Sequence, residues 1–384
     1  MADELVMCVS DDSAAVSVMS SDLSLTALAS SGYLPTNPVD VDLNPSGALL
    51  AIVYGTGNRL TVINTSDWSV VSGTPSIAGT SNGVAFSPDG SLLAVAHVSG
   101  NRLTVINTSD WSVVSGTPSI TSTGNGVAFS PNGGLLAAGH ASGNNLTVIN
   151  TDDWSIVSGT PSLAGTAYGV AFSPDGSLLA VAHFSGNRLT VLNTNDWSVV
   201  SGTPSITSTG RDVAFSPDGS LLAVAHDSGN RLTVINTSDW SVVSGNLNES
   251  QNAKSVSFNS SGTLLAGSFS STTDSVRIFN TSDWSRNNDA TVIDGGCDGV
   301  LFTHTAILKQ VSGTIRDSGG SGASRDVVVF DRRDVGNFRS VESDLSGSYS
   351  VPVAGVFETI RIALADDVAE GEIFNHLIDR VIPE

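Results

Sequence analysis

Short apolar runs recur along the first three hundred residues, and small polar residues separate them. In the unit that spans residues 84–115, four such runs are divided by turn residues such as Pro88-Asp89-Gly90. Pro presets one backbone dihedral of a turn and Gly supplies the other, while short alternating runs are typical of strands. The unit therefore predicts four strands, of which the last lies nearest the outside: 84–87, 92–97, 102–107 and 111–115.

The unit repeats with a period of about 43 residues. Six tryptophans mark it, with spacings of 43, 43, 43, 43 and 44: Trp68, Trp111, Trp154, Trp197, Trp240 and Trp284. This period is typical of a four-stranded propeller blade. Because one small sheet cannot bury both of its faces, neighbouring units must stack around an axis. The repeat therefore predicts an all-β fold, a β-propeller.

The two ends of the repeat region supply one further blade. Leu5–Met19 aligns without a gap on Leu92–Ile106, and Leu23–Ala29 supplies a fourth strand. The missing first strand is matched by Asp298–Phe302. With the six complete units between them, this predicts a seven-bladed propeller. One strand from its C-terminal end and three from the N-terminus close the ring, which removes an open sheet edge.

Two segments carry a resemblance to known propellers. Residues 84–97 read "VAFSPDGSLLAVAH" and residues 103–114 read "LTVINTSDWSVV". They resemble the YVTN/WD-repeat propeller families, and the resemblance extends over residues 4–303. The tryptophan-aspartate dipeptide of WD repeats is absent, so the YVTN-like group is the nearer one. The resemblance implies the architecture and leaves the function open, because propellers serve many functions.

The period stops near residue 304, and a different pattern follows. The stretches "GTIRD", "DVVVFDRR" and "SDLSGSYSVPV" are short and alternating, with turn residues between them. They resemble the carboxypeptidase-regulatory-like, transthyretin-like β-sandwich. The ending Phe374–Glu384 resembles that of such domains in tailed-bacteriophage virion proteins. We therefore expect a propeller over residues 1–304 and a small immunoglobulin- or transthyretin-like β-sandwich over residues 305–384.

Charge and hydropathy exclude several classes of partner. The formal net charge is −21, from 16 basic and 37 acidic residues. Such a surface repels nucleic acid and anionic membranes. No apolar run approaches the roughly 18 residues of a membrane helix, and the N-terminal segment lacks the basic start and apolar core of a signal peptide. We expect no nucleic-acid binding and no membrane insertion.

Signals of catalysis are weak. The repeat region holds only two glutamates, Glu4 and Glu249, which argues against a Glu-based acid–base pair. No Gly-rich phosphate loop follows a strand, and no Cys/His cluster has metal-ligand spacing. We expect no enzyme activity, no catalytic residue, no metal and no cofactor.

Three kinds of polar residue recur from blade to blade. Histidines end the second strand of four units, aspartates lie in the "PDG" and "SDW" turns, and arginines precede the third strand. A structural role is the favoured interpretation for each: turn capping for His and Asp, and pairing with carboxylates for Arg. The alternatives are ligand contact by the histidines and a Ca²⁺-attracting acidic rim. The histidines are His97, His140, His183 and His226, and the arginines are Arg59, Arg102, Arg188 and Arg231.

Both cysteines belong to the blade that the two ends form. In the aligned hairpin, the partner of Cys8 is Val300, and Cys297 lies three residues further along. Three residues of strand span roughly 10 Å, which is beyond the reach of a disulfide. Cys8 and Cys297 are therefore predicted to be free thiols.

One position changes in size and charge while its neighbours barely vary. It stands just before the inner strand of each unit, where the chain enters the rim of the central channel. Drift in an exposed loop is one interpretation, and an asymmetric mouth that binds a ligand or partner is the other. The residues are Asn82, Asn125, Tyr168, Arg211, Lys254 and Asp298.

These observations favour a non-enzymatic structural or binding protein of a tailed-phage virion, either a tail-associated adhesion module or a capsid decoration module. It would be located in the virion as a homo-oligomer. Its partners would be other virion proteins and a host-surface glycan or protein. Two alternatives remain: a bacterial surface or extracellular propeller that binds glycan or protein, and a lactonase-like propeller hydrolase.

Overall fold

A computed structural model describes three N-terminal strands, most of residues 37–302, and six C-terminal strands. The N-terminal strands are residues 6–10, 15–19 and 25–28. The gaps within 37–302 are 57–59, 66–68, 78, 101, 121, 144, 164, 185–187, 207, 228–231, 244–246, 248, 250, 271–274 and 287–296. The C-terminal strands are 308–314, 326–331, 338–342, 348–354, 360–365 and 376–381. Among the described residues, none lies in a helix long and apolar enough to cross a membrane.

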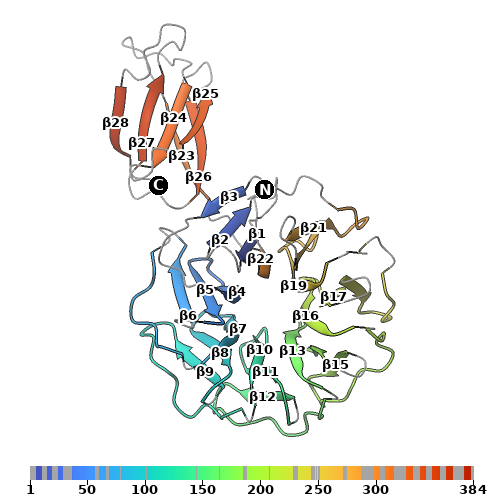
Figure 1. Cartoon of the computed structure of the whole chain (residues 1–384). Helices are drawn as coiled ribbons and strands as arrows, with labels where there is room; N and C mark the ends of the chain where they lie inside the picture. The colour runs from blue at the N-terminus through green and yellow to red at the C-terminus, as the bar shows by residue number, and fades with distance from the viewer. Residues whose placement is uncertain are drawn as a thin grey trace. The chain divides into compact units, whose positions relative to one another are not determined.

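The chain divides into two compact units. One comprises Met1–Ile63 and Val70–Thr305, and the other comprises Asn64–Ser69 and Ala306–Glu384. In the described part of the first unit, antiparallel sheets are arranged around a central axis (Figure 1).

Six of these sheets have three strands each, in simple sequence order. Each begins with an inner strand and continues outward. Their strands are β4 (Pro38–Leu43), β5 (Leu49–Tyr54) and β6 (Leu60–Asn64); β7 (Ser81–Phe86), β8 (Leu92–His97) and β9 (Leu103–Asn107); β10 (Gly124–Phe129), β11 (Leu135–His140) and β12 (Leu146–Asn150); β13 (Ala167–Phe172), β14 (Leu178–His183) and β15 (Leu189–Asn193); β16 (Gly210–Phe215), β17 (Leu221–His226) and β18 (Leu232–Asn236); β19 (Ala253–Phe258), β20 (Leu264–Phe269) and β21 (Val276–Asn280). We number these blades one to six.

The seventh sheet joins the two ends of the repeat region. Its order is β22 (Cys297–Phe302), β1 (Val6–Ser10), β2 (Ala15–Met19) and β3 (Leu25–Leu28). β22 pairs antiparallel with β1, as the alignment predicted. The inner strands are neighbours in the order β4, β7, β10, β13, β16, β19 and β22, and β22 also contacts β4. The described inner strands therefore form a closed ring (Figure 1).

Apolar packing between successive blades forms the core of this unit. In the six sequential blades the middle strand is covered on both faces, so Leu93, Ala94 and Val95 are fully buried in β8. One cluster joins Leu103 on blade two to Phe129 on blade three. Because every blade is packed between two others, the ring is a rigid scaffold for its loops.

The predicted outer strand is not formed as a strand in the six sequential blades. The outer segment makes a single antiparallel bridge, for example between Ile106 and Val113. Trp111 ends the preceding turn in a left-handed conformation, with φ of 60°, and its N–H donates to the carbonyl of Asn107 at 2.8 Å. The chain pairs only briefly after this turn, and the Val113 side chain remains 53% exposed.

The second unit is also all-β in its described strands. β23 (Leu308–Thr314) pairs with β26 (Ser348–Ala354), and a separate sheet has four strands. The order of that sheet is β25 (Phe338–Glu342), β24 (Asp326–Asp331), β27 (Ile360–Ala365) and β28 (His376–Val381). That these two sheets form a sandwich stays a prediction.

Candidate binding site at the channel mouth

The position that varies between blades coincides with a β-bulge. In blade two, Ser81 lies opposite His97 and Gly83 lies opposite Ala96, so Asn82 has no partner across the pair. An extra residue of this kind bends its strand and redirects its own side chain. The register shifts in the same way in five further inner strands, at or beside Asn125, Tyr168, Arg211, Lys254 and Asp298.

Blade one has the same bulge, which adds a residue that the sequence comparison missed. Pro38 lies opposite Tyr54 and Asp40 lies opposite Val53, so the extra residue is Val39. Blade one matches the repeat least well, and this concealed the equivalence. All seven side chains are partly exposed, and we call them the mouth residues: Val39, Asn82, Asn125, Tyr168, Arg211, Lys254 and Asp298.

Two mouth asparagines connect neighbouring blades. Asn82 Nδ2 donates to the carbonyl of Gly124 at 2.9 Å, and it lies 3.4 Å from Asn125 Oδ1. Asn125 Nδ2 in turn donates to the carbonyl of Ala167 at 2.6 Å. Each amide is therefore held in place by the next blade around the ring.

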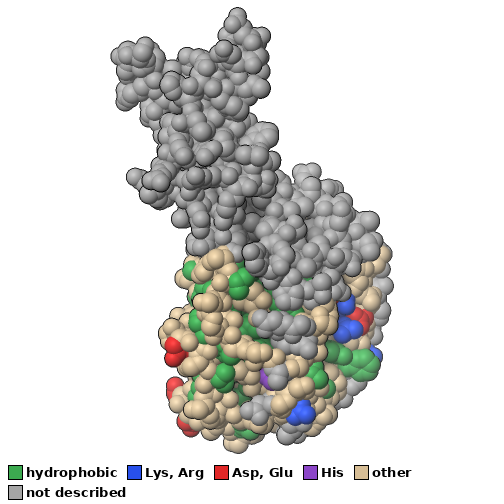
Figure 2. Space-filling model, turned by 60° about the vertical axis from the view of Figure 1, so that its left-hand side comes forward, with side chains coloured by type: hydrophobic (Ala, Val, Ile, Leu, Met, Phe, Trp, Pro, Cys, Tyr) green, Lys and Arg blue, Asp and Glu red, His purple; other side chains and the backbone are tan. Residues whose placement is uncertain are grey.

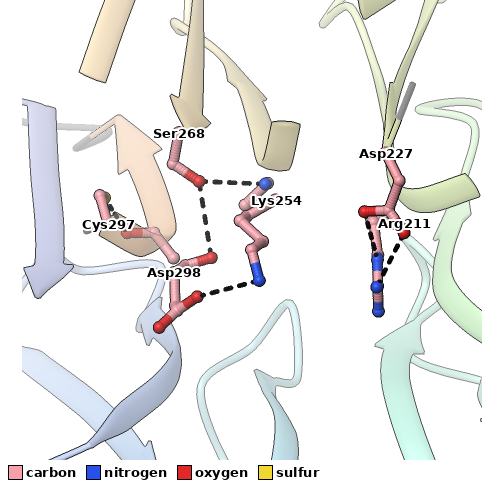
Figure 3. A network of polar contacts seen from close by, with 8 residues as sticks. Arg211, Asp227, Lys254, Ser268, Cys297 and Asp298 are labelled. Atoms are coloured by element: carbon pink, nitrogen blue, oxygen red, sulfur yellow. Dashed lines mark hydrogen bonds and ion pairs between the residues drawn. The ribbon is translucent and has the colours of Figure 1, made fainter. Parts of the chain in front are cut away.

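Arg211 is held by two groups of different character. Its guanidinium carbon lies 5.0 Å from the centre of the Tyr168 ring on the preceding blade. Its Nε and Nη2 donate to the two carboxylate oxygens of Asp227, at 2.9 and 2.8 Å (Figure 3). These hydrogen bonds raise the pKa of Arg211 above its usual value. The guanidinium is thus fixed in one orientation at the mouth.

Lys254 also has an acidic neighbour at the mouth. Its Nζ lies 3.7 Å from the carboxylate of Asp298 on the composite blade (Figure 3). Both cationic mouth residues are therefore charge-balanced by a carboxylate. Elsewhere, charged side chains are sparse on the described part of the face in Figure 2, which agrees with the 14% of charged residues in the chain.

A second varied position lies beside five of the mouth residues and was not recognised from the sequence. It is the residue directly after the second strand, and its N–H donates to the carbonyl of the loop before the inner strand. The distances are 2.8 Å for Val98 to Thr80, 3.0 Å for Ala141 to Thr123, 2.9 Å for Phe184 to Thr166, 3.1 Å for Asp227 to Thr209 and 2.9 Å for Ser270 to Asn252. Of these, Phe184 is a large apolar side chain that remains 55% exposed.

Three carboxylates lie on the inner strands of blades one and five. Asp40 accepts a hydrogen bond from the N–H of Val84 at 3.0 Å, and Asp42 accepts one from the N–H of Phe86 at 2.7 Å. Asp212 accepts from the N–H of Val256 at 3.0 Å. Each carboxylate thus binds the inner strand of the next blade.

Burial changes the protonation of these inner carboxyl groups. Removal from solvent raises the pKa of Asp40 to about 8 and that of Asp42 to about 7, despite the opposing backbone hydrogen bonds. Burial also raises the pKa of Asp212. Because Asp40, Asp42 and Asp212 join neighbouring blades, we assign them to the scaffold of the propeller.

The repeated histidines are structural. Each is buried, and its Nε2 lies within hydrogen-bonding distance of a threonine on the third strand of its own blade. The distance is 2.9 Å from His97 to Thr104 and 3.0 Å from His140 to Thr147. In blade six the same two places hold Phe269 and Arg277, and the guanidinium lies 4.3 Å from the ring centre. No group of three potential metal ligands occurs among the described residues.

The repeated turn aspartates bond within their own turns, as expected. The carboxylate of Asp89 accepts hydrogen bonds from the hydroxyl groups of Ser87 and Ser91 at 2.6 and 2.8 Å. Asp110 accepts from Ser112 in the same way at 2.7 Å. These bonds lower the pKa of both aspartates.

Two of the repeated arginines, Arg102 and Arg188, contact backbone carbonyl groups, and the pairing of the repeated arginines with carboxylates stays a prediction. Nη1 of Arg102 and of Arg188 lies 3.4 Å from the carbonyl oxygen of Ile120 and of Ile206, respectively. Asn145 occupies the same place and donates to Leu163 at 3.0 Å. The arginines Arg59 and Arg231 lie outside the described residues.

The prediction of free thiols was wrong. Cys297 is disulfide-bonded, and the chain has one other cysteine, Cys8. Cys8 does lie opposite Val300, as the alignment indicated, but the bulge brings Cys297 opposite Ser10. Cys297 is therefore two positions from Cys8 along β1, instead of the three that an unbroken ladder would require.

Solved structures show a similar fold. The chain is similar to Kuenenia stuttgartiensis hydrazine synthase, with a TM-score of 0.59 and 17% identity over 73% of this chain and 94% of the other. It is also similar to a functionally unknown protein from Desulfotomaculum acetoxidans DSM 771, with a TM-score of 0.57 and 18% identity over 78% and 99% of the two chains. The repeat region is a β-propeller.

At these identities the propeller similarity concerns the fold alone. No protein-family model matches the chain, and no curated protein matches it either. The function therefore has to be inferred from the mouth residues and their surroundings.

Proposed function

We propose that this chain is a non-enzymatic binding protein that recognises its ligand or partner at the channel mouth of the propeller. The observation that supports this is the coincidence of sequence variation with the bulges. Blades that are otherwise nearly identical differ at Asn82, Tyr168 and Arg211, where the backbone redirects the side chain. Bulges commonly lie next to functional sites.

The scaffold supports recognition because it holds the mouth residues in place. The amides of Asn82 and Asn125 are fixed by backbone carbonyls of the next blade, and Arg211 is fixed by Asp227. Side chains that are already ordered lose little conformational entropy on binding. A rigid ring with one asymmetric rim suits a display module.

The mouth does not suggest a reaction. Asp227 and Asp298 are paired with cations, while Asp40 and Asp42 bind backbone N–H groups of the next blade. A general acid or base needs a carboxyl group that can reach the substrate. The binding role is therefore the better account of these residues.

The setting that we propose is a tailed-phage virion, as a tail-associated adhesion or capsid decoration module. The support is the resemblance of residues 305–384, and of their ending, to β-sandwich domains of such particles. In this proposal the C-terminal region anchors a homo-oligomer to other virion proteins, and the propeller presents its mouth to a host-surface glycan or protein.

Mass spectrometry of purified particles tests the setting. Peptides from both units at a constant ratio to the major capsid or tail protein would support it, and their absence from intact particles would contradict it. The genomic neighbourhood provides a second test. Capsid and tail genes are expected there, whereas secretion or surface-layer genes would favour a bacterial surface propeller that binds glycan or protein.

A further inference from the structure

We propose that the channel mouth binds an uncharged saccharide and that the contacts centre on blades four and five. This inference rests on the proposed use of the mouth as a binding site, and it is independent of the virion setting. We call the relevant residues the recognition sector: Tyr168, Phe184, Arg211, Asp227 and Lys254.

The charges at the mouth argue against an anionic ligand. Asp227 takes two N–H groups of Arg211, and Asp298 lies 3.7 Å from the ammonium of Lys254. Among the residues that the structure describes here, these two cations and two carboxylates balance one another in charge. The chain as a whole carries −21, so an anion would meet repulsion during its approach.

The same charge pairs suit a ligand with many hydroxyl groups. The bidentate pair fixes the donors of Arg211 and the acceptors of Asp227 side by side, about 2.8 Å apart. A hydroxyl group can donate to the carboxylate and accept from the guanidinium at the same time. No described hydrogen bond to another side chain uses Nη1 of Arg211, which leaves donors for a ligand.

The aromatic side chains complement these polar groups. Phe184 is 55% exposed, and the hydrogen bond from its N–H to the carbonyl of Thr166 places it beside the loop that leads to Tyr168. The corresponding residues of neighbouring blades are Ala141 and Asp227. A flat apolar ring next to a few fixed polar groups is the usual composition of a site for a small ligand. The C–H face of a pyranose ring would pack on the phenyl ring while its hydroxyl groups meet the charge pair.

The first experiment screens the full-length protein against an array that holds both neutral and anionic oligosaccharides, together with an acidic peptide, poly-glutamate. We expect binding to neutral oligosaccharides. The affinity of the best one, measured by calorimetry, should change less than about twofold between 50 and 500 mM NaCl, because no net charge is neutralised.

The second experiment uses two variants with matched controls. Phe184→Ala and Asp227→Asn should each weaken binding of that saccharide by tenfold or more. Val98→Ala changes the equivalent loop residue in blade two, and Asp89→Asn changes an aspartate in a turn, so both should leave the affinity unchanged. The melting temperature of every variant, measured by circular dichroism, shows whether weaker binding comes from a lost ligand contact or from a loss of folding.

Three results would overturn the inference. The first is binding of anionic glycans or poly-glutamate alone, the second is no binding of any neutral saccharide on the array, and the third is equal affinity of Phe184→Ala and Val98→Ala. A protein ligand whose binding depends on the mouth residues would overturn the saccharide inference while leaving the proposed binding function intact. A ligand that binds equally well when the mouth residues are replaced would overturn both the saccharide inference and the proposed binding function.

Discussion

Arg211 and Asp227 form a two-pronged ion pair, with 2.9 Å from Nε and 2.8 Å from Nη2 to the two carboxylate oxygens. Both residues occupy positions that differ between otherwise similar blades, and blade two holds Asn82 and Val98 there. The two changes in blade five are complementary. Two varied positions therefore contact each other in this blade. Independent drift at each position does not explain why the two side chains form a matched pair.

The first prediction concerns the strength of this pair. A double-mutant cycle with Arg211→Ala and Asp227→Ala, measured by urea unfolding, should give a coupling energy of about 1 kcal/mol, since the pair is bidentate but partly exposed to solvent. The coupling should fall in 1 M NaCl. Additive effects of the two substitutions would mean that the pair is not formed in solution.

The second prediction concerns the close approach of inner strands. A Cβ added at Gly83 would overlap the carbonyl oxygen of Asn125 on the next blade. Gly83→Ala should therefore destabilise the propeller by roughly 2–3 kcal/mol, because backbone must shift.

Gly134→Ala is the matched control for that substitution. The nearest atom to its added Cβ is Asn132 Oδ1 at 3.4 Å, and the corresponding residue in blade two is Ser91. The free energy of unfolding of the Gly134→Ala variant should stay within about 0.5 kcal/mol of that of the parent protein. Equal stabilities of Gly83→Ala and Gly134→Ala would contradict the packing described around the axis.

The third prediction concerns pH. The pKa of Asp40 is raised to about 8 and that of Asp42 to about 7, so the folded state favours their protonated forms. The stability that this contributes is fully present below the ordinary aspartate pKa and is lost as pH rises through 7 and 8. Denaturant unfolding should show stability falling between pH 5 and 8, by at most about 1.4 kcal/mol per pH unit for each carboxyl group below its folded-state pKa.

The double variant Asp40→Asn with Asp42→Asn isolates that effect. An amide oxygen can still accept from the N–H of Val84 or Phe86, while the titration is removed. The variant should therefore show a flatter dependence on pH across this range. A slope identical to that of the parent would show that other groups cause the loss.

Much of the propeller could be predicted from the sequence because its signals are local and repeated. The second strand of blade two was expected at 92–97 and lies at Leu92–His97. The joining of the N-terminal strands to β22 followed from an alignment without gaps. Turn residues and apolar–polar alternation depend only on positions close together in the sequence. The same strands are also indicated separately in each repeat.

The features that were missed depend on register and on contacts between blades. The sequence does not show where a β-bulge occurs. For this reason neither the disulfide of Cys297 nor the position of Val39 at the bulge of blade one was predicted. The outer strand was overestimated because Trp111 adopts a left-handed conformation that a residue of its type rarely shows. The pairing of Arg211 with Asp227 joins residues 16 positions apart and required the fold.

The fourth prediction concerns the disulfide of the composite blade. Because a crosslink there joins the two ends of the ring, reduction should lower stability by about 2–5 kcal/mol and reduce the melting temperature. Differential scanning calorimetry with and without a phosphine reductant measures this. The Cys297→Ser variant should melt at the reduced temperature under both conditions, and a melting temperature of the parent that is indifferent to reductant would contradict the crosslink.

The central claim is that the varied bulge residues form the binding site, and one variant tests it directly. Replacing Tyr168, Arg211, Lys254 and Asp298 by Asn gives these blades the residue that blades two and three already carry at the bulge. The measurement is the dissociation constant of the ligand found on the array, for this variant and the parent, at equal melting temperature. We predict at least a hundredfold weaker binding, and an unchanged dissociation constant would contradict the account.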